Sequence, residues 1–452
     1  MNQKGESYRQ LLGYWAPEMV TMAVLNTLPL LFDAYVIAQL KSTSTYGTLG
    51  IVNNFLHMLM KLAESVSVAT IALVGRYNGA KDYKRVGSTL GDAFWTTLVI
   101  GAVPSLLLFS FSTEILVALD VPKHMAILGS PFLKLRSLGV FLLFINLAFL
   151  GFMRGVKNTK TPMKIYIVGI SIFMVFDYIL VLGKVGLPAR GLTGSAIATL
   201  IQYSVMIVMS TWHILRTEKY KIYFSKAFYY FFSKEGIIKI ITLSIPILID
   251  KAALSSAYVR LNQVINPMGK YAIASFTLIK DLERLAFLPA IAFATVITFL
   301  VSNRLGAGDQ EGARANIRKV LYLAGGMVAV GLFVISVNPA FFAEVFDPRK
   351  KFSSFAGAAF PFISLLVVFD FIQLILAGVL RGAGDVKTVM WIRFCTCFFF
   401  FYPVSKFIST LPIENELLKF ILIYGSFYLN TGLMGLLFIF RLKSKRWSTT
   451  KI

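Results

Sequence analysis

Isolated carboxylates inside apolar stretches are the residues of this sequence best suited to do chemistry. Asp33 lies late in an otherwise uncharged apolar run, and Asp177 lies within Phe173-Met174-Val175-Phe176-Asp177-Tyr178. Neither has a Lys or Arg within one helical turn of sequence. A charged side chain inside a membrane costs about 2.5–3.5 kcal/mol on insertion scales, so each acid needs a reason to be there. Each could accept a proton or bind sodium, with a purely structural role as the alternative.

Polar side chains on other apolar runs could complete such a site. Ser195 and Thr199 are four residues apart, so their hydroxyl groups share one face of a helix. Hydroxyl and carboxylate oxygens suit a hard cation or a proton relay, although small hydroxyl residues also simply pack helices.

A third run carries a polar stripe at helical spacing, formed by Asn53 or Asn54, His57, Lys61 and Glu64. Lys61 and Glu64 are three residues apart and can form an ion pair, which is the structural interpretation. In the functional interpretation Lys61 tunes a neighbouring acid, or His57 titrates near neutral pH.

The C-terminal half has its own intramembrane acids. Asp370 has no basic partner in its run and is followed one turn later by Gln373, so a substrate or cation role is expected there. Asp250, beside Lys251, is a further candidate. In Lys280-Asp281-x-Glu283-Arg284 the charges balance, and we expect Lys280–Glu283 and Asp281–Arg284 pairs with a structural or latch role.

The composition indicates what must position these side chains. The chain is 57% hydrophobic and 15% charged, with a mean hydropathy of +0.71, and apolar stretches of about 20 residues recur from end to end. We expect an all-α integral membrane protein, because helices satisfy their own backbone groups in lipid. Twelve transmembrane helices are predicted, at 14–40, 46–74, 87–111, 126–153, 162–182, 191–215, 240–265, 271–303, 320–337, 356–380, 387–409 and 418–440.

The chain is also duplicated. Arg154-Gly155-x-x-Asn158-x-Lys160-Thr161-x-Met163 recurs as Arg381-Gly382-x-x-Asp385-x-Lys387-Thr388-x-Met390, and Asn78-Gly79-Ala80-Lys81-Asp82 recurs one residue shorter as Gly306-Ala307-Gly308-Asp309. Six spans per half is an even number, so the halves form two parallel-repeat six-helix lobes. The predicted domains are an N-lobe at 1–215, a cytoplasmic linker at 216–236, a C-lobe at 237–440 and a basic tail at 441–452.

The net charge of +23 reflects topology rather than nucleic-acid binding. Lys and Arg concentrate in the segments on the same side as the two termini, which predicts an inner (plasma) membrane protein with both termini cytoplasmic. The start lacks a cleavable signal pattern, and Cys395 and Cys397 in one apolar span indicate neither a metal site nor a disulfide framework. The basic, aromatic linker, with Lys226, Tyr229 and Phe231, is expected beside anionic membrane lipid.

These motifs, in this order, resemble the multidrug and toxic compound extrusion (MATE) family, including its NorM and DinF-type bacterial members. The resemblance covers nearly the whole chain. It rests on Pro17 and Asp33, on the two repeated loops, on Asp370-x-x-Gln373 before Leu380-Arg381-Gly382, and above all on Asp177-Tyr178-x(4)-Gly183-x-x-Gly186-x-Pro188-x-x-Gly191-x-x-Gly194-Ser195-Ala196-Ile197-Ala198-Thr199.

The resemblance implies two six-helix lobes and export of amphipathic, often cationic compounds in exchange for sodium or protons. It implies a cation site at Asp33, Asp177, Ser195 and Thr199, and bending at Pro17. Pro17 and Pro246 lie in the first turns of predicted spans, so they could also be plain helix starts. The family commonly has asparagine where this chain has Phe173, and a glutamate where it has Leu254, for which Asp250 is a candidate substitute.

The resulting prediction is a monomeric secondary antiporter, not an enzyme, without a cofactor other than H⁺ or Na⁺. No phosphate-binding glycine motif is present. A flippase for lipid-linked sugars or peptidoglycan precursors of the same superfamily is the alternative, which Arg136 and Arg260 would favour because they could bind a diphosphate. A channel is a further alternative, but the two-lobe duplication indicates alternating access.

Overall fold

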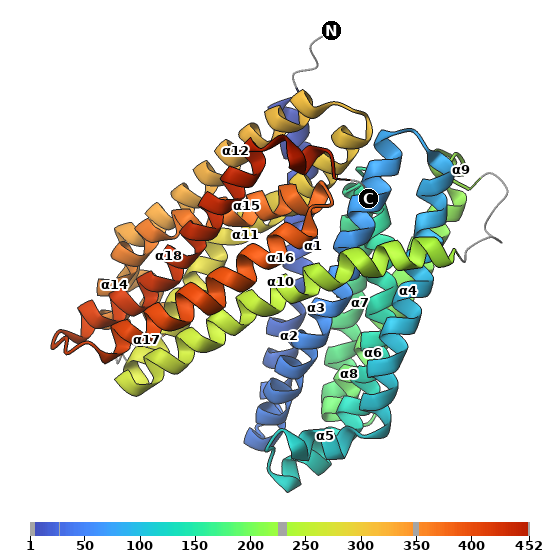
Figure 1. Cartoon of the computed structure of the whole chain (residues 1–452). Helices are drawn as coiled ribbons and strands as arrows, with labels where there is room; N and C mark the ends of the chain where they lie inside the picture. The colour runs from blue at the N-terminus through green and yellow to red at the C-terminus, as the bar shows by residue number, and fades with distance from the viewer. Residues whose placement is uncertain (1–4, 27, 225–232, 347–351, 451–452) are drawn as a thin grey trace. The chain divides into compact units, whose positions relative to one another are not determined.

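The structure is a computed structural model that describes residues 5–26, 28–224, 233–346 and 352–450, in which every regular element is helical (Figure 1). Lys226, Tyr229 and Phe231 of the predicted linker lie outside the described residues. The helices up to the linker are α1 (Tyr8–Asn26), α2 (Leu28–Ala38), α3 (Thr43–Gly79), α4 (Tyr83–Ser110), α5 (Ser112–Ala118), α6 (Lys123–Gly155), α7 (Lys160–Leu182), α8 (Gly191–Arg216) and α9 (Glu218–Lys221).

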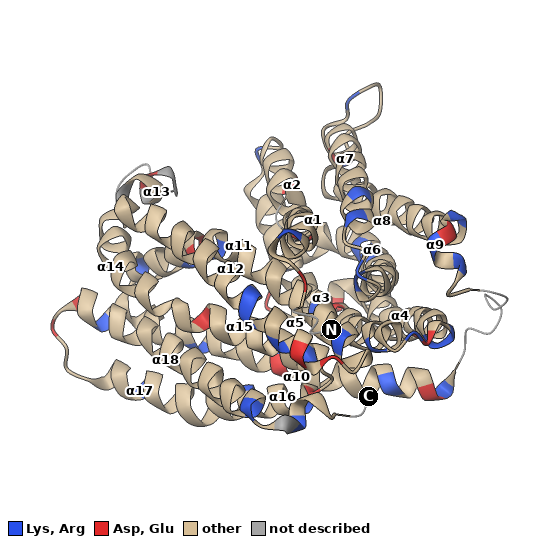
Figure 2. Cartoon of the chain, turned by 90° about the horizontal axis from the view of Figure 1, so that it is seen from above, with Lys and Arg blue, Asp and Glu red and all other residues tan. Residues whose placement is uncertain are grey.

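The second half repeats this helical pattern. Its helices are α10 (Lys234–Ile265), α11 (Lys270–Gly306), α12 (Gln310–Val337), α13 (Pro339–Phe346), α14 (Ser353–Leu366), α15 (Val368–Gly382), α16 (Val386–Cys395), a π-helical segment (Thr396–Phe401), α17 (Tyr402–Thr410) and α18 (Glu416–Lys443). Most of the ribbon carries neither basic nor acidic residues (Figure 2).

The predicted fold class is confirmed. Among the described residues ten helices are long and apolar enough to cross a membrane, and α14 with α15, bent by 45°, makes an eleventh. The remaining predicted span, 240–265, corresponds to α10. Helices extend beyond the apolar runs, most clearly α12, which begins ten residues before the predicted start at 320. Hydropathy marks where the apolar face ends, whereas capping by Asp309 marks where the helix begins.

The chain divides into two compact units. The N-unit is Ala16–Ser244, and the C-unit is Ile245–Ile452 together with Met1–Trp15. The division therefore falls inside α1, between Trp15 and Ala16, one residue before Pro17.

The repeated loops form equivalent turns in the two units. Lys81 and Gly308 both have a positive φ, of 59° and 75°, and the next residue in each case, Asp82 or Asp309, caps the following helix by accepting a hydrogen bond from its third residue. The shared loop chemistry thus reflects the need to stop one long helix and start the next within a few residues.

The repeated Arg-Gly loops end helices that pack very closely on a neighbour. A Cβ atom on Gly151 of α6 would lie 2.8 Å from the carbonyl oxygen of Ser67 on α3, and one on Gly378 of α15 would lie 2.6 Å from that of Ala294 on α11. Only glycine allows the two backbones to approach this closely, as is usual where membrane helices pack on small residues.

Each repeated loop arginine is buried and paired with an acid from the first long helix segment of its unit. Arg154 forms an ion pair with the fully buried Glu18 of α1, through two guanidinium nitrogens. Arg381 pairs in the same way with Asp250 of α10. These pairs bind the first helix segment of each unit to its fourth apolar segment.

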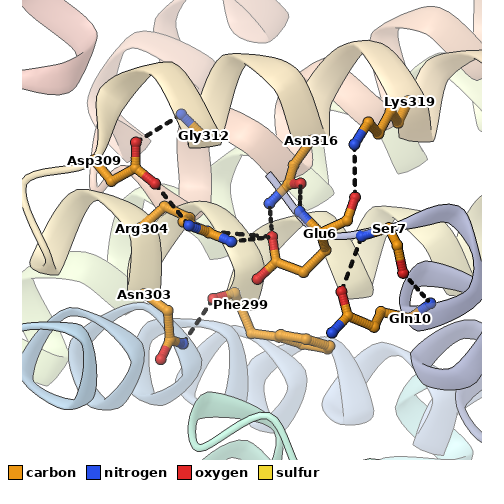
Figure 3. A network of polar contacts seen from close by, with 10 residues as sticks. All are labelled: Glu6, Ser7, Gln10, Phe299, Asn303, Arg304, Asp309, Gly312, Asn316 and Lys319. Atoms are coloured by element: carbon orange, nitrogen blue, oxygen red, sulfur yellow. Dashed lines mark hydrogen bonds and ion pairs between the residues drawn. The ribbon is translucent and has the colours of Figure 1, made fainter. Parts of the chain in front are cut away.

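The start of the chain is fixed to the C-unit (Figure 3). Ser7 and Gln10 form a capping box at the start of α1, with each side chain accepting the backbone N–H of the other at 3.2 and 2.9 Å. Glu6 is buried and accepts hydrogen bonds from Arg304, at 3.1 Å from Nη2, and from Asn316, while Lys319 donates to its carbonyl oxygen at 2.8 Å. A charged side chain with this many partners anchors the segment.

Glu6→Ala should loosen the first turns of α1. Hydrogen bonds to a charged group contribute about 1.5–3 kcal/mol, so amide hydrogen exchange of Ser7–Gly13 should accelerate by about tenfold or more. Glu218→Ala is the control, because Glu218 forms an exposed pair with Lys221. Unchanged exchange in Glu6→Ala would show that the contacts in Figure 3 do not anchor the segment.

Candidate functional site

The N-unit brings Asp33 and Ser195 together, as the sequence predicted. Asp33 of α2 is 2% exposed, and Ser195 of α8 donates a hydrogen bond from its Oγ to Asp33 Oδ1 at 2.7 Å. Gly194, the preceding residue, packs with its Cα against the backbone of Leu180 on α7, which brings α8 close to the helix that carries Asp177. The glycine-rich connection between these helices therefore positions the serine.

Asp177 of α7 is fully buried and close enough to Asp33 for the two carboxyl groups to interact electrostatically. Within the described part of the chain, neither of its oxygen atoms accepts a hydrogen bond by geometry. A buried carboxyl without donors is costly in its ionised form. Ionising both acids in this buried setting is therefore unfavourable without a compensating positive charge.

Arg136 of α6 lies beside these acids, which the sequence analysis did not anticipate. Its Nη1 donates to Thr199 Oγ1 at 2.5 Å, and its Nη2 donates to Asn53 Oδ1 at 3.1 Å. No Lys or Arg lies within one helical turn of Asp33 in the sequence. In the folded chain, however, Arg136 of another helix is its basic neighbour. The guanidinium is held by neutral oxygens and not by an ion pair to Asp33.

A small cavity of about 50 Å³ connects these groups. Asp33, Arg136, Thr199, Asn53 and His57 line it, so the stripe on α3 contributes its first two members to the site. Of Asn53 and Asn54, the structure places Asn53 there, while Asn54 is exposed. The volume suffices for one or a few waters or for an ion.

The other members of the α3 stripe lie apart from the cavity lining. Lys61 and Glu64 form the predicted ion pair, with 3.5 Å between Nζ and Oε2 and both side chains partly exposed. Phe173, where the family commonly has asparagine, lines the cavity with its ring. The amide of Asn53 reaches the same cavity from α3.

In the C-unit, Asp250 is the centre of a fixed ion cluster. Arg381 donates to it from Nε at 3.1 Å and from Nη2 at 2.7 Å, and Arg393 donates from Nη1 at 2.8 Å. Asp250 and Arg393 are buried, at 0% and 2% exposed. Two guanidinium groups therefore neutralise the carboxylate of Asp250, which the sequence analysis gave as a candidate substitute for the family glutamate.

Gln373 connects this cluster to Asp370. The amide oxygen of Gln373 accepts a hydrogen bond from Arg393 at 2.7 Å, and its nitrogen donates to Asp370 Oδ1 at 2.8 Å. The spacing of Asp370 and Gln373 on α15 thus produces a direct contact. Asp370 ends a polar chain that leads to two arginines.

Glu283 of α11 is a site residue that sequence reasoning missed. The expected pair with Lys280 does not form; the Lys280 ammonium lies 5.7 Å from the centre of the Phe276 ring. Glu283 is 6% exposed and accepts a hydrogen bond from Tyr424 at 2.6 Å, while its Oε1 has no partner within the described residues. Tyr424 stacks on Tyr428, so aromatic rings surround the acid.

The two prolines are helix-interior residues. The sequence placed Pro17 and Pro246 in first turns, but α1 begins at Tyr8 and α10 at Lys234, so plain helix starts are excluded. The unit boundary between Trp15 and Ala16 lies one residue before Pro17, where the backbone amide hydrogen is missing.

The family profile named MatE matches residues 17–179 and 246–405 of this chain. The chain belongs to the MatE family. It is 21% identical over 333 residues to "Probable multidrug resistance protein NorM" of Idiomarina loihiensis, covering 74% of this chain and 72% of that protein. It is 23% identical to "Probable multidrug resistance protein YoeA" of Bacillus subtilis, over 62% of this chain and 61% of that protein.

Solved structures show the same fold for this MatE protein. "Crystal structure of MATE in the bent conformation" superimposes with a TM-score of 0.88 over 99% of this chain and 98% of that chain, at 16% identity. The predicted resemblance is therefore confirmed, and the chain is a multi-pass membrane protein with the MATE fold.

The sequence contains a signal for each of two residues whose position the sequence analysis did not predict, Arg136 and Glu283. Arg136 is a charge inside a predicted span, which is itself a signal of function. Glu283 was hidden by a charge-balanced motif, since spacing of three residues permits a pair without requiring it.

Asp250→Asn should destabilise the C-unit. Removing one partner of a buried ion pair costs about 3–5 kcal/mol, because the remaining charges are left uncompensated. Asp370→Asn is the matched control: asparagine can still accept from Gln373, and a change below about 1 kcal/mol is expected. Both are measured by reversible unfolding in mixed detergent micelles, and equal losses would contradict a purely scaffolding role for Asp250.

Proposed function

We propose that the protein is a secondary active antiporter that exports amphipathic, cationic organic compounds by alternating access, in exchange for a monovalent cation. The observation that carries the proposal is a small cavity lined by Asp33, Thr199 and Arg136. Two buried residues lie behind it: Ser195, which donates to Asp33, and Asp177, whose carboxyl interacts electrostatically with that of Asp33. The relatives named as multidrug resistance proteins support the substrate class.

The charge of this cavity suggests how one ion is coupled. Two carboxylates against one guanidinium leave one excess negative charge when all three are ionised. Because an uncompensated charge inside the membrane is costly, the site favours the uptake of a single cation. Loss of that cation restores an acidic site that attracts the next one.

Among the two candidate ions we infer that the proton is the coupling ion. Sodium requires several free oxygen ligands in a small space, but Thr199 Oγ1 already accepts from Arg136, and Phe173 provides a ring instead of an amide. A proton needs only one carboxyl oxygen. Asp177 offers two oxygens that have no hydrogen-bond partner among the described residues.

In the C-unit we propose that Asp370, Gln373 and Glu283 recognise the organic cation. Glu283 and its tyrosines combine a negative charge with aromatic faces, which attract organic cations. In this proposal Asp250 has a structural role. In the N-unit, the Lys61–Glu64 pair and His57 form a polar relay beside the cation site. Pro17 and Pro246 are the proposed hinges.

The proposed setting is the inner (plasma) membrane, with both termini cytoplasmic and the protein acting as a monomer among membrane lipids. The distribution of Lys and Arg along the sequence supports this orientation. No nucleic-acid partner and no cofactor beyond the coupling ion are proposed.

Arg136 in the N-unit cavity supports a second candidate, a flippase for a lipid-linked sugar or peptidoglycan precursor. A guanidinium is suited to bind a diphosphate. Here, however, Arg136 already donates to two neutral side chains. Translocation of a fluorescent lipid-linked sugar by reconstituted protein would favour this candidate.

The ion proposal is tested with proteoliposomes and a fluorescent organic cation. An imposed pH gradient should drive transport, whereas a sodium gradient at uniform pH should not. Asp33→Asn should abolish the driven component, because one carboxylate against one guanidinium leaves no excess negative charge to take up the proton.

Asp82→Asn is the matched control in the same unit. Asp82 caps α4, and asparagine caps equally well, so its transport should equal that of the wild type. Transport driven by sodium alone, or full activity of a correctly folded Asp33→Asn protein, would refute proton coupling at this site.

Glu283→Gln should weaken binding of the organic cation but spare folding, since glutamine still accepts from Tyr424. The expected rise in Kd is about tenfold, the loss of roughly 1.4 kcal/mol that removing a desolvated cation contact entails. Equilibrium binding of the fluorescent cation measures it. Arg284→Gln, on the next residue of the same helix, is the control, and an equal effect there would refute the role of Glu283.

A further inference from the structure

A second, larger cavity opens at the other end of the C-unit from the contacts of Figure 3. It has a volume of about 500 Å³ and lies between the end of α10 and the connection from α17 to α18. The 37 residues of α11 separate it along the chain from Arg304, a helix length of about 55 Å. With the orientation proposed above, the cavity faces the outer leaflet.

The cavity is lined by charges of both signs. Arg260, Lys406 and Lys419 supply three cations, and Glu414 and Glu416 supply two acids. Lys419 donates to the carbonyl oxygen of Leu411 at 3.3 Å, which holds its ammonium near the loop. Both acids are exposed, whereas Arg260 is partly buried. Lys419 is partly buried too, while Lys406 is exposed, so two of the three cations, Arg260 and Lys419, lie deeper than the acids.

Arg260 is held in place without using its hydrogen-bonding capacity. Its guanidinium lies 5.5 Å from the centre of the Tyr402 ring, and its buried Nε has no hydrogen-bond partner in the described part of the chain. Tyr402 is fixed in turn, because its hydroxyl donates to the carbonyl of Ser256 at 3.2 Å. A guanidinium that is positioned by an aromatic ring and left short of acceptors is prepared to bind an anion.

The backbone around Tyr402 is also unusual. The π-helical segment Thr396–Phe401 ends directly before it. Such π-helical turns are rare and occur mostly at functional sites, where they re-aim the side chains that follow. The turn here sets the direction of the ring on which Arg260 lies.

We propose that this cavity binds the phosphoethanolamine headgroup of a phospholipid. The phosphate would lie on Arg260 with Lys406 and Lys419 nearby, and the ammonium would lie at the rim against Glu414 and Glu416. On the cytoplasmic side of membranes, basic pockets between helices bind the phosphates of lipid headgroups, and the same charge pairing applies to this cavity. The cavity exceeds many times the roughly 30 Å³ that one water occupies in the liquid. A headgroup with both charges matches the order of cations and acids, which a purely anionic headgroup does not.

Native mass spectrometry of the delipidated full-length protein tests this. The wild type should bind phosphatidylethanolamine more tightly than phosphatidylglycerol. Arg260→Gln should weaken phosphatidylethanolamine binding by about tenfold or more, as expected for losing a charge-assisted hydrogen bond. The double variant Glu414→Gln with Glu416→Gln should remove the preference for the ethanolamine headgroup.

Lys270→Gln is the matched control, because Lys270 is an exposed base at the same end of the unit that does not line the cavity. Its affinity for the lipid should equal that of the wild type. If Arg260→Gln fails to fold, the exposed Lys406→Gln replaces it with the same expected direction.

Two results would overturn the assignment. One is wild-type affinity for phosphatidylethanolamine in a folded Arg260→Gln or Lys406→Gln protein. The other is displacement of the lipid by inorganic phosphate or glycerophosphoethanolamine at comparable concentrations, which would identify a soluble phosphate ligand instead. Because binding is measured without transport, the outcome is independent of the antiporter proposal.

Discussion

Charge neutralisation inside an apolar helical bundle is the constraint on which the rest of this structure depends. Buried ion pairs within one unit, such as that between Glu18 and Arg154, hold helices together with their charges neutralised. Where Asp33, Asp177 and Arg136 meet, one negative charge is left in excess. A closed pair holds helices together but cannot respond to an ion. An open excess costs stability, and this cost is the basis of the cation binding proposed above.

The duplication separates these two uses of charge. The loop arginines and the close-packing glycines occur in both units and do the same structural work in each. The acids are not duplicated: the position of Asp33 in the repeat corresponds to one near Asn262 in the second half. The duplicated loop arginines and glycines thus form the same scaffold in both units, whereas the ionisable groups inside each unit differ. The hydroxyl and amide partners in the N-unit contrast with the tyrosines around Glu283 in the C-unit.

Much of the fold could be predicted from the sequence, because span length, the capping aspartates and the repeated glycines are local signals. The contact of Ser195 with Asp33 was predictable from shared faces and the family pattern. What the sequence could not give is proximity between helices. Arg136 reaches the site from α6. Glu283 accepts a hydrogen bond from Tyr424 of α18 and does not pair with Lys280, one turn away on its own helix. Tertiary packing decides among several locally permitted partners, and spacing along one helix does not.

Helix α1 shows why local anchoring and flexibility must coexist in one element. Its start is bound to the C-unit through Glu6, and Glu18, beyond Pro17, is bound to the N-unit through Arg154. The two contacts hold α1 to different units. Any movement of one unit against the other must therefore be accommodated between Glu6 and Glu18. Pro17 lacks the amide that would stiffen this stretch, so deformation costs least there. Asp33 lies in α2, the next helix along the chain, so the proposed cation site and the proposed hinge at Pro17 are close in sequence.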